Sequence, residues 1–316
     1  MQQTVSVVIP VKNRADLLPI TLENILAQTL RPLEIIVVDD GSTDNLLQVI
    51  KNYRDRVIFM KNEGRGPGAA RNTGLKNASG NLIQFFDSDD LMTLNKLEVQ
   101  EQLISKTNVG MVYSPHVKAY EVRGKWVQTD AILYYRPLPK SLRYDQWVVR
   151  GACMITQACL FDKSIFQETG LWREDLMTHE DLELLFRIGK VVPYPKHTNE
   201  AAVIYRQHGQ QITDLQVNSF NRTLDGYTAM KLIRENMKGE YSLLDKITIE
   251  GNIYNSLNTI SSYRKTLEKK NKGGKLAAFY NKINGKLNRL LTRSDWQILH
   301  GINSSEETFR EYITMI

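Results

Sequence analysis

The sequence is poor in cysteine and has no long apolar segment. Its 316 residues include two cysteines, Cys153 and Cys159, which lack Cys-x-x-Cys spacing. This argues against a disulfide scaffold or a cysteine zinc site and favours two buried thiols. No run approaches the roughly 18 apolar residues that a spanning helix needs. The first residues also lack the basic and apolar regions of a signal peptide, so we expect a cytoplasmic protein.

The chain has no acidic excess, and its positive charge is unevenly distributed. Residues 1–214 contain 25 Lys+Arg and 25 Asp+Glu, whereas residues 215–316 contain 16 and 10, which sum to the totals of 41 and 35. Ten of these basic residues lie in 264–293, with Glu268 as the one acid. Such a segment is typical of a solvated helix face or of a surface that meets phosphate or an anionic membrane. It carries no nucleic-acid-binding motif, so we do not expect a nucleic-acid partner.

The first ninety residues alternate between two patterns. Apolar, β-branched runs predict strands at 5–9, 34–38, 56–60 and 81–86. Helical patterns lie between them at 16–29, 44–53 and 68–78. This alternation predicts a doubly wound sheet whose parallel strands are covered on both faces.

The pattern changes twice further along the chain. We expect a helix near 93–105, strand-like segments at 110–122, 126–134, 150–161 and 201–205, and a helix from about 178. After residue 207 the expected elements are helices, at 217–236, 242–270, 274–291 and 305–314, with a break at Lys272-Gly273-Gly274. The sequence therefore predicts an α/β domain over 1–214 and a helical, basic region over 215–316.

Polar or turn-forming residues follow each of the first four predicted strands. They occupy positions 10–13, 39–42, 62–64 and 87–90. Each segment alone could be an ordinary turn or helix cap. Ligands bind at the carboxyl ends of the strands in open α/β sheets, so together the segments predict one binding crevice.

The acidic segment 87–90 is the sharpest of these signals. Asp87, Asp89 and Asp90 would repel one another unless a cation or hydrogen-bond donors lay between them. Magnesium and manganese commonly bind one or two carboxylates and complete their shell with substrate phosphates. The alternative is a solvent-facing acidic turn that caps the next helix.

Three other segments have open interpretations. The glycines of 64–68 (GRGPG) match a dinucleotide-binding loop poorly, and we expect them to let the backbone pass close to a ligand or neighbour. Thr178 is placed to cap a helix with Asp181 near its third position, while Glu180 or Asp181 could accept a proton from a hydroxyl. His208 is a lone histidine, which is most often structural.

Seven segments together resemble the successive motifs of the family 2 glycosyltransferases. They are 5–13 (VSVVIPVKN), 36–44 (IVVDDGSTD), 68–75 (GAARNTGL), 86–90 (FDSDD), 170–172 (GLW), 179–181 (HED) and 205–208 (YRQH). The resemblance covers about residues 4–210. It implies a GT-A fold, a Rossmann-like doubly wound mixed sheet with a helical C-terminal extension. Residues 1–110 would form the nucleotide-binding half of the catalytic domain and 111–214 its acceptor half.

The resemblance also implies roles for individual residues. Asp39 would bind the base, Arg71 would lie near base or phosphate, and Asp87 and Asp89 would form the D-x-D pair. The implied nucleotide pocket contains Pro10, Val11, Asn13, Arg14, Asp39, Asn62, Arg71, Asp87 and Ser88. Asp89, Asp87 and His208 would hold manganese or magnesium. Asp181 resembles the general base, with Glu180 beside it in the catalytic pair.

The implied reaction is a single displacement with inversion, from a nucleoside diphosphate sugar to an acceptor hydroxyl. The family and Asp39 favour a uridine diphosphate donor. The chain lacks the Q-x-x-R-W motif of processive synthases, so we expect a non-processive enzyme of polysaccharide or glycolipid synthesis. The acceptor, a saccharide or a lipid-linked molecule, is not identified. We further expect residues 264–293 to dock the enzyme at the inner face of an anionic membrane.

Two rival functions make predictions that differ from this one. A nucleotidyltransferase needs a glycine-rich loop with lysine after the first strand, whereas residues 10–14 (PVKNR) contain no glycine. A non-catalytic module that binds sugar nucleotides or a partner on the same scaffold is the alternative. Asp87, Asp89 and Asp181 argue against it, and hydrolysis of a donor would separate the two.

Overall fold

The computed structural model describes residues 3–122, 125–128, 137–151, 154–208, 219–239 and 241–270. The chain divides into two compact units, Met1–Gln211 and Ile212–Ile316.

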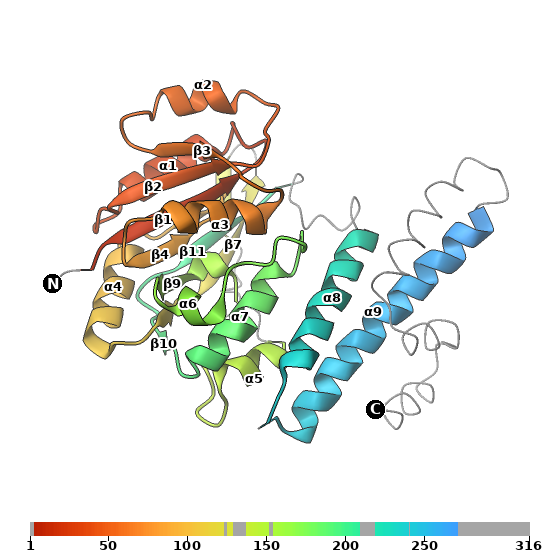
Figure 1. The fold of residues 1–316 in the computed structure, drawn as a ribbon. Coiled ribbons are helices and arrows are strands. Elements are labelled where there is room, and N and C mark those ends of the chain that lie inside the picture. The colour runs from red at the N-terminus through yellow and green to blue at the C-terminus, as the bar shows by residue number, and fades with distance from the viewer. Residues whose placement is uncertain are drawn as a thin grey trace. The chain divides into compact units, whose positions relative to one another are not determined.

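A seven-stranded mixed sheet forms the centre of the first unit (Figure 1). Its strands, in spatial order, are β10 (Lys196–His197), β6 (Met111–Tyr113), β9 (Cys159–Asp162), β4 (Leu82–Phe85), β1 (Val5–Val11), β2 (Glu34–Asp39) and β3 (Ile58–Lys61). β1 pairs in parallel with β2 and β4, and β2 pairs in parallel with β3. These pairings confirm the four predicted parallel strands. β9 runs antiparallel to both β4 and β6, which makes the sheet mixed.

The apolar strand sequences are buried as predicted, with one exception. Val7, Val8 and Ile9 of β1 have no exposed surface, and β4 is buried along its length. Ile58 of β3 is 44% exposed. The expectation that all four strands are covered on both faces is therefore wrong for β3, because this strand lies at the edge of the sheet.

Helices of the first unit connect and cover these strands (Figure 1). Their bounds are α1 (Leu18–Leu26), α2 (Leu46–Lys51), α3 (Pro67–Asn77), α4 (Lys96–Thr107), α5 (Tyr144–Val149), α6 (Ile165–Thr169) and α7 (Glu180–Val191). α3 packs on β1 and β2. Gly74 allows this packing, because a Cβ atom there would lie 2.3 Å from Cγ1 of Val8.

The region around 150–161 differs from its prediction as a strand-like segment. Among the described residues of this segment only Cys159–Asp162 forms a strand, and it is preceded by a 3-10 turn, η1 (Thr156–Ala158). Buried side-chain amides of Gln84 and Gln100 donate hydrogen bonds to backbone carbonyls of this turn, and so satisfy carbonyls that lie outside a strand. Cys159 is fully buried, while Cys153 lies outside the described residues.

A second, four-stranded sheet carries the last motif of the first unit. Its order is β5 (Leu91–Met92), β11 (Val203–Gln207), β7 (His116–Val122) and β8 (Lys125–Gln128). β11 runs parallel to β7 and antiparallel to β5. Since β5 directly follows the acidic segment 87–90, this pairing holds β11 and His208 beside that segment. The remainder of the strand predicted at 126–134 lies outside the described residues.

The described part of the second unit consists of two helices that pack on each other, α8 (Ser219–Asn236) and α9 (Leu243–Lys270). They confirm the helices predicted at 217–236 and 242–270. The helices predicted at 274–291 and 305–314 and the break at 272–274 lie outside the described residues. Among the described helices, none is long and apolar enough to cross a membrane.

Candidate active site

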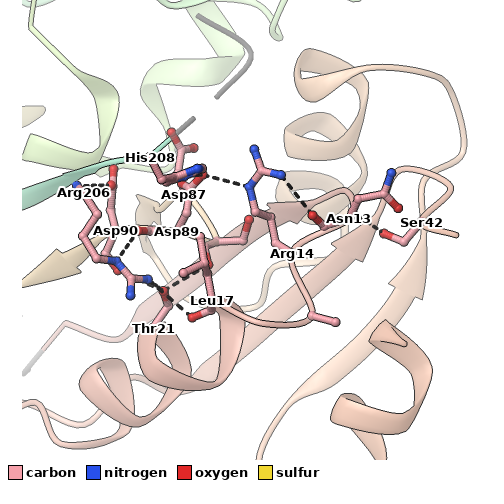
Figure 2. A network of polar contacts seen from close by, with 12 residues as sticks. Asn13, Arg14, Leu17, Thr21, Ser42, Asp87, Asp89, Asp90, Arg206 and His208 are labelled. Carbon is pink, nitrogen blue, oxygen red and sulfur yellow. Dashed lines mark hydrogen bonds and ion pairs between the residues drawn. The ribbon is translucent and has the colours of Figure 1, made fainter. Parts of the chain in front are cut away.

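Segments that follow the first four strands come together at one edge of the main sheet. After β1, the backbone N of Asn13 donates to Ser42 Oγ (3.0 Å) and Arg14 Nε donates to Asp89 (3.1 Å), as Figure 2 shows. After β3, Asn62 Nδ2 donates to Asp40 Oδ1 at 2.6 Å. The predicted convergence of the four strand ends is therefore confirmed.

Asp89 is the most strongly ionised carboxylate of the acidic segment. Its Oδ2 lies 3.1 Å from Nε of Arg14 and 3.0 Å from Nε2 of His208 (Figure 2). Burial acts to raise the pKa of Asp89, but the hydrogen bonds and positive charge of these two neighbours outweigh it and hold the pKa below its ordinary value. Asp89 is thus a stable anion at neutral pH.

Asp87 is bound by Arg71 and by Gln157. Arg71 Nη2 donates to Asp87 Oδ1 at 2.8 Å, and Gln157 Nε2 donates to Asp87 Oδ2. Burial raises the pKa of Asp87; Arg71 opposes the rise, while the charge of Asp89 adds to it. The Asp87 side chain is still 29% exposed, so it remains accessible to a ligand.

Asp90 points into the protein instead. It is fully buried, accepts from the backbone N of Arg206 at 3.0 Å, and accepts from Gln157 Nε2 at 3.1 Å. Burial and the charges of Asp89 and Asp87 raise its pKa well above the ordinary value. Asp90 therefore belongs to the framework of the site.

Arg206 and Thr21 fasten the acidic segment to helix α1. The guanidinium of Arg206 donates to the backbone O of Asp89 and to Thr21 Oγ1 (2.9 Å), and Figure 2 shows it between them. Thr21 Oγ1 in turn donates to the backbone O of Ser88 and of Asp90, both at 3.0 Å. Ser88, predicted for the nucleotide pocket, is buried in this framework.

The acidic segment has hydrogen-bond donors between its carboxylates and also a cluster of oxygens that could hold a cation. One oxygen each of Asp87, Asp89 and Asp90 lie within 4.8 Å of one another. Protein donors from Arg14, Arg71, Gln157, Arg206 and His208 separate the carboxylates. Asp89 is ionised and its Oδ1 has no protein partner among the described residues. The residues therefore fit a hard divalent cation with Asp89 as its main protein ligand, because such cations bind one or two carboxylates and substrate phosphates.

Glu180 and Asp181 at the start of α7 have different surroundings. Glu180 is buried and accepts from Arg71 Nη1 at 2.8 Å. Burial raises its pKa to about 7 against the opposing charge of Arg71. Asp181 is partly exposed and accepts from the backbone N of Leu182 (2.8 Å), and its charge contributes to the raised pKa of Asp87. Asp181 is therefore the more available base of the two.

The predicted N-cap of α7 is wrong. His179 occupies the cap position in a left-handed conformation (φ 62°), because the helix begins at Glu180. The Thr178 hydroxyl lies 3.1 Å from Nδ1 of His179 and does not cap the helix. The left-handed residue turns the chain so that Glu180 enters the protein toward Arg71.

The other residues of the predicted pocket line the ends of β1 and β2. Asp39 Oδ1 accepts from the backbone N of Ser42 at 2.8 Å. Pro10 and Val11 pair with Val38 and Asp39 in the sheet. The neighbouring Asp40 is instead committed to protein partners, since it accepts from Lys12 (3.1 Å), Asn62 and the backbone N of Gly66 (2.8 Å).

The glycine-rich loop 64–68 lies against the segment that leads into α7. A Cβ atom at Gly66 would lie 2.7 Å from Met177 Sδ, and one at Gly68 would lie 2.4 Å from the backbone O of Arg173. This confirms the expectation of a close neighbour. The close approach brings Arg71 of α3 within reach of Glu180, and the Arg71 guanidinium stacks 4.5 Å over the ring of Trp172.

Four residues of the site were missed from the sequence. Trp172 and Arg206 lie inside the recognised segments 170–172 and 205–208, and Asp40 follows Asp39, so each had a positional signal. Gln157 had none, because an amide in an apolar segment resembles any other polar residue.

Comparison with known proteins identifies the sequence pattern. The family described as "Glycosyl transferase family 2" matches residues 6–170. An uncharacterized glycosyltransferase of Rickettsia conorii is 31% identical over 66% of this chain and 34% of its own length. The Escherichia coli protein WfgD, named as a UDP-Glc:alpha-D-GlcNAc-diphosphoundecaprenol beta-1,3-glucosyltransferase, is 35% identical over 42% of this chain and 54% of its own. The chain spans only 34% of the length of the Rickettsia conorii protein and 21% of that of an uncharacterized glycosyltransferase of Rickettsia felis.

Solved structures share the fold at low sequence identity. S. aureus TarS 1–349, solved in complex with UDP-GlcNAc, has a TM-score of 0.59 and 18% identity and covers 93% of this chain and 83% of its own. Mannosyltransferase PcManGT from Pyrobaculum calidifontis, solved with GDP-Man and Mn2+, has a TM-score of 0.57 and 17% identity, covering 100% and 84%. These similarities establish the predicted GT-A fold with C-terminal helices.

Proposed function

The chain belongs to glycosyl transferase family 2, and from this premise we propose that it transfers a sugar from a nucleoside diphosphate donor to an acceptor hydroxyl. The single observation that carries the proposal is the position of Asp89. It is an ionised carboxylate at the strand-end crevice of the sheet, flanked by Arg14 and His208, and its Oδ1 has no partner in the part of the chain that the structure describes. The whole donor pocket would contain Pro10, Val11, Asn13, Arg14, Asp39, Asn62, Arg71, Asp87 and Ser88.

The proposed donor is a uridine diphosphate sugar. Asp39 Oδ1 accepts a hydrogen bond from the backbone N of Ser42. Asp39 Oδ2 would accept a hydrogen bond from a ring N–H of the base. The name of WfgD and the TarS complex both refer to uridine diphosphate sugars. PcManGT, with GDP-Man, is a reason to test guanosine donors as well.

A divalent cation would be held by Asp89, with Asp87 and His208 as further ligands. When bound, manganese or magnesium supplies positive charge that stabilises the departing diphosphate. Arg14 contributes a fixed positive charge at the same point, 3.1 Å from Asp89. Asp87 is accessible to a cation because its side chain is partly exposed, although both of its oxygens accept from protein donors.

Asp181 is the proposed general base. It would accept the proton of the acceptor hydroxyl while that oxygen attacks the anomeric carbon from the face opposite the diphosphate, which inverts the configuration. A positioned base is commonly worth about 10² to 10⁴ in rate. Glu180 would hold Arg71, since its carboxylate is buried against that guanidinium. The enzyme would be non-processive.

The proposed acceptor is a saccharide, either free or lipid-linked. The printed name of WfgD specifies a sugar on a diphosphoundecaprenol carrier, which makes a lipid-linked saccharide the first acceptor to test. Residues 1–214 would form the catalytic domain, with residues 111–214 as its acceptor half, and residues 215–316 would be the appended helical region.

The first experiment measures binding and slow hydrolysis of uridine, guanosine and thymidine diphosphate sugars with manganese, magnesium or a chelator. Asp89→Asn should abolish the metal-dependent part of donor binding. Asp181→Asn should keep donor binding and lose transfer to acceptor by at least about 100-fold. Asp55→Asn, at an exposed position, is the matched control and should behave as wild type.

Two outcomes would redirect the proposal. Donor binding without any hydrolysis or transfer would favour the non-catalytic sugar-nucleotide module. If no donor bound with either metal, the transferase proposal would be wrong and a partner-binding role would be the one to pursue.

A further inference from the structure

Lys96 is a buried lysine that follows the acidic segment in the sequence, and it contacts no carboxylate in the described part of the chain. It is at the start of α4, and its side chain has no exposed surface. Its Nζ donates to Oε1 of Gln84 on β4 and to Oε1 of Gln100 on α4, the latter at 2.8 Å. A buried lysine without a carboxylate partner is costly, which suggests that its polar contacts have a further role.

Those two contacts fix the orientation of both amides. An ammonium or amine N–H can pair only with the oxygen of a side-chain amide, so the NH2 group of each glutamine must point away from Lys96. Gln84 Nε2 then donates to the backbone O of Gln157 at 3.0 Å, and Gln100 Nε2 donates to the backbone O of Ala158 at 2.9 Å. Both acceptors belong to the turn η1.

Gln157, which belongs to η1, contacts the acidic segment. Gln157 Nε2 donates to Oδ2 of Asp87 and, at 3.1 Å, to Oδ2 of Asp90. A series of hydrogen bonds therefore runs from Lys96 through Gln84 and the turn to two carboxylates of the site, and it is buried except at the partly exposed contact with Asp87. Lys96, Gln84 and Gln100 of this series have no exposed surface.

The protonation of Lys96 agrees with this arrangement. Burial lowers its pKa to about 7, which makes the uncharged amine accessible near neutral pH. An uncharged amine has two N–H donors, which matches the two amide oxygens that it contacts.

We infer that Lys96 is a positioning residue of the donor site, which sets the turn η1 and, through Gln157, holds Asp87 and Asp90 in place. Lys96 touches no reacting atom, so its effect must pass through Gln157. The inference rests on the proposed function, because Asp87 belongs to the proposed donor site. Lys96→Met keeps the length and bulk of the side chain and removes both donors. Gln157→Leu removes the last link.

The experiment measures UDP affinity in the presence of manganese by calorimetry, for wild type, each single variant and the double variant. Lys106→Met, an exposed lysine on the same helix, is the matched control. Leu97→Ala removes buried apolar contacts from α4 without touching the amides, and therefore reports destabilisation alone. Crystal structures of wild type and Lys96→Met without ligand give a second readout that does not depend on nucleotide binding.

Lys96→Met and Gln157→Leu should each weaken UDP binding about five- to tenfold, the usual effect of losing one to two net hydrogen bonds. The double variant should bind no more weakly than Gln157→Leu alone, because both changes break the same series. Lys106→Met and Leu97→Ala should leave UDP affinity unchanged. The Lys96→Met crystal structure should show the Gln157 amide moved from Asp87.

Three results would overturn the inference. These are wild-type UDP affinity in Lys96→Met, multiplicative losses in the double variant, or an unmoved Gln157 in the crystal. Should Lys96→Met fail to fold, Gln100→Leu breaks the same series at Ala158, and its wild-type affinity would count equally against the inference. Absence of UDP binding by wild type would refute the proposed donor instead, while the crystal comparison would still decide the role of Lys96.

Discussion

Arg71 is the residue on which the electrostatics of the site depend. It joins two carboxylates from distant parts of the chain, Asp87 and Glu180, at 2.8 Å each. Its guanidinium is buried, and the two carboxylates raise its pKa against the opposing effect of burial. Lysine could not make both contacts in this fork geometry, because an ammonium is a point charge.

Arg71→Met should cost about 3 to 5 kcal/mol of unfolding free energy at pH 8, the usual result of leaving buried charges unpaired. Without Arg71 the pKa values of Asp87 and Glu180 rise further above their unfolded values, so the folded protein gains most from their protonation at low pH. The deficit relative to wild type should therefore shrink between pH 8 and pH 5, as measured by urea unfolding. Arg56→Met, which breaks an exposed pair with Glu23, should cost less than about 1 kcal/mol. A deficit independent of pH would show that lost packing on Trp172 dominates.

Sequence order explains which site residues were predictable. Asp89 and Arg14 follow the paired strands β4 and β1, so their meeting could be anticipated from the sequence. The role of His208 was implied only by the family resemblance. Lys96 and Gln157 could not be found this way, because a lysine at a helix start normally reads as solvent-exposed. The burial of Lys96 depends on how α4 packs against β6 and β9, and the position of Gln157 depends on how η1 packs against β4.

Among the elements, the contact between α3 and the segment before α7 determines the geometry of the site. Gly68, in the first turn of α3, approaches the backbone of Arg173 so closely that no side chain fits. Gly110 offers a comparison, since a Cβ there would meet methyl groups of Ile165 and Val192, each at 2.9 Å. Side chains can shift more readily than backbone.

Gly68→Ala should lower the unfolding free energy by about 1 to 3 kcal/mol and also weaken donor binding, because α3 carries Arg71 away from Glu180. Gly110→Ala should cost less and leave donor binding unchanged. Urea unfolding and calorimetry with UDP check the two effects separately. Equal donor affinities for the two variants would contradict a role for this contact in the site.

The strands and helices differ in how well the sequence predicts them. Continuous apolar runs identified β1, β2 and β4 because both faces of these strands are covered, while β3 carries the same pattern at an exposed edge. The short helices α5 and α6 have six and five residues, too few for the helical period to appear. The antiparallel placement of β9 depends on tertiary packing that no local pattern reports.

Across the whole molecule, the excess of positive charge lies in residues 215–316. Residues 264–293 lie largely outside the described residues, and their proposed docking on an anionic membrane rests on ten basic side chains against one acid. Each basic residue near such a surface is worth about 1 kcal/mol at physiological salt. The full chain should therefore co-sediment with vesicles of phosphatidylglycerol and phosphatidylcholine, and not with phosphatidylcholine alone.

Replacing Lys269, Lys270, Lys272 and Lys275 by glutamine should abolish this binding, as should about 1 M salt, which shortens the Debye length to about 3 Å. The matched control replaces the same number of exposed lysines in the first unit, Lys51, Lys76, Lys106 and Lys140. If both variants lost binding equally, total charge rather than the segment would be responsible. Because the mechanism requires only local attraction, the four tail substitutions should leave donor affinity in solution unchanged while slowing transfer to a lipid-linked acceptor in vesicles. Absence of binding to anionic vesicles at low salt would refute the docking proposal and leave the positive segment as a solvated helix face.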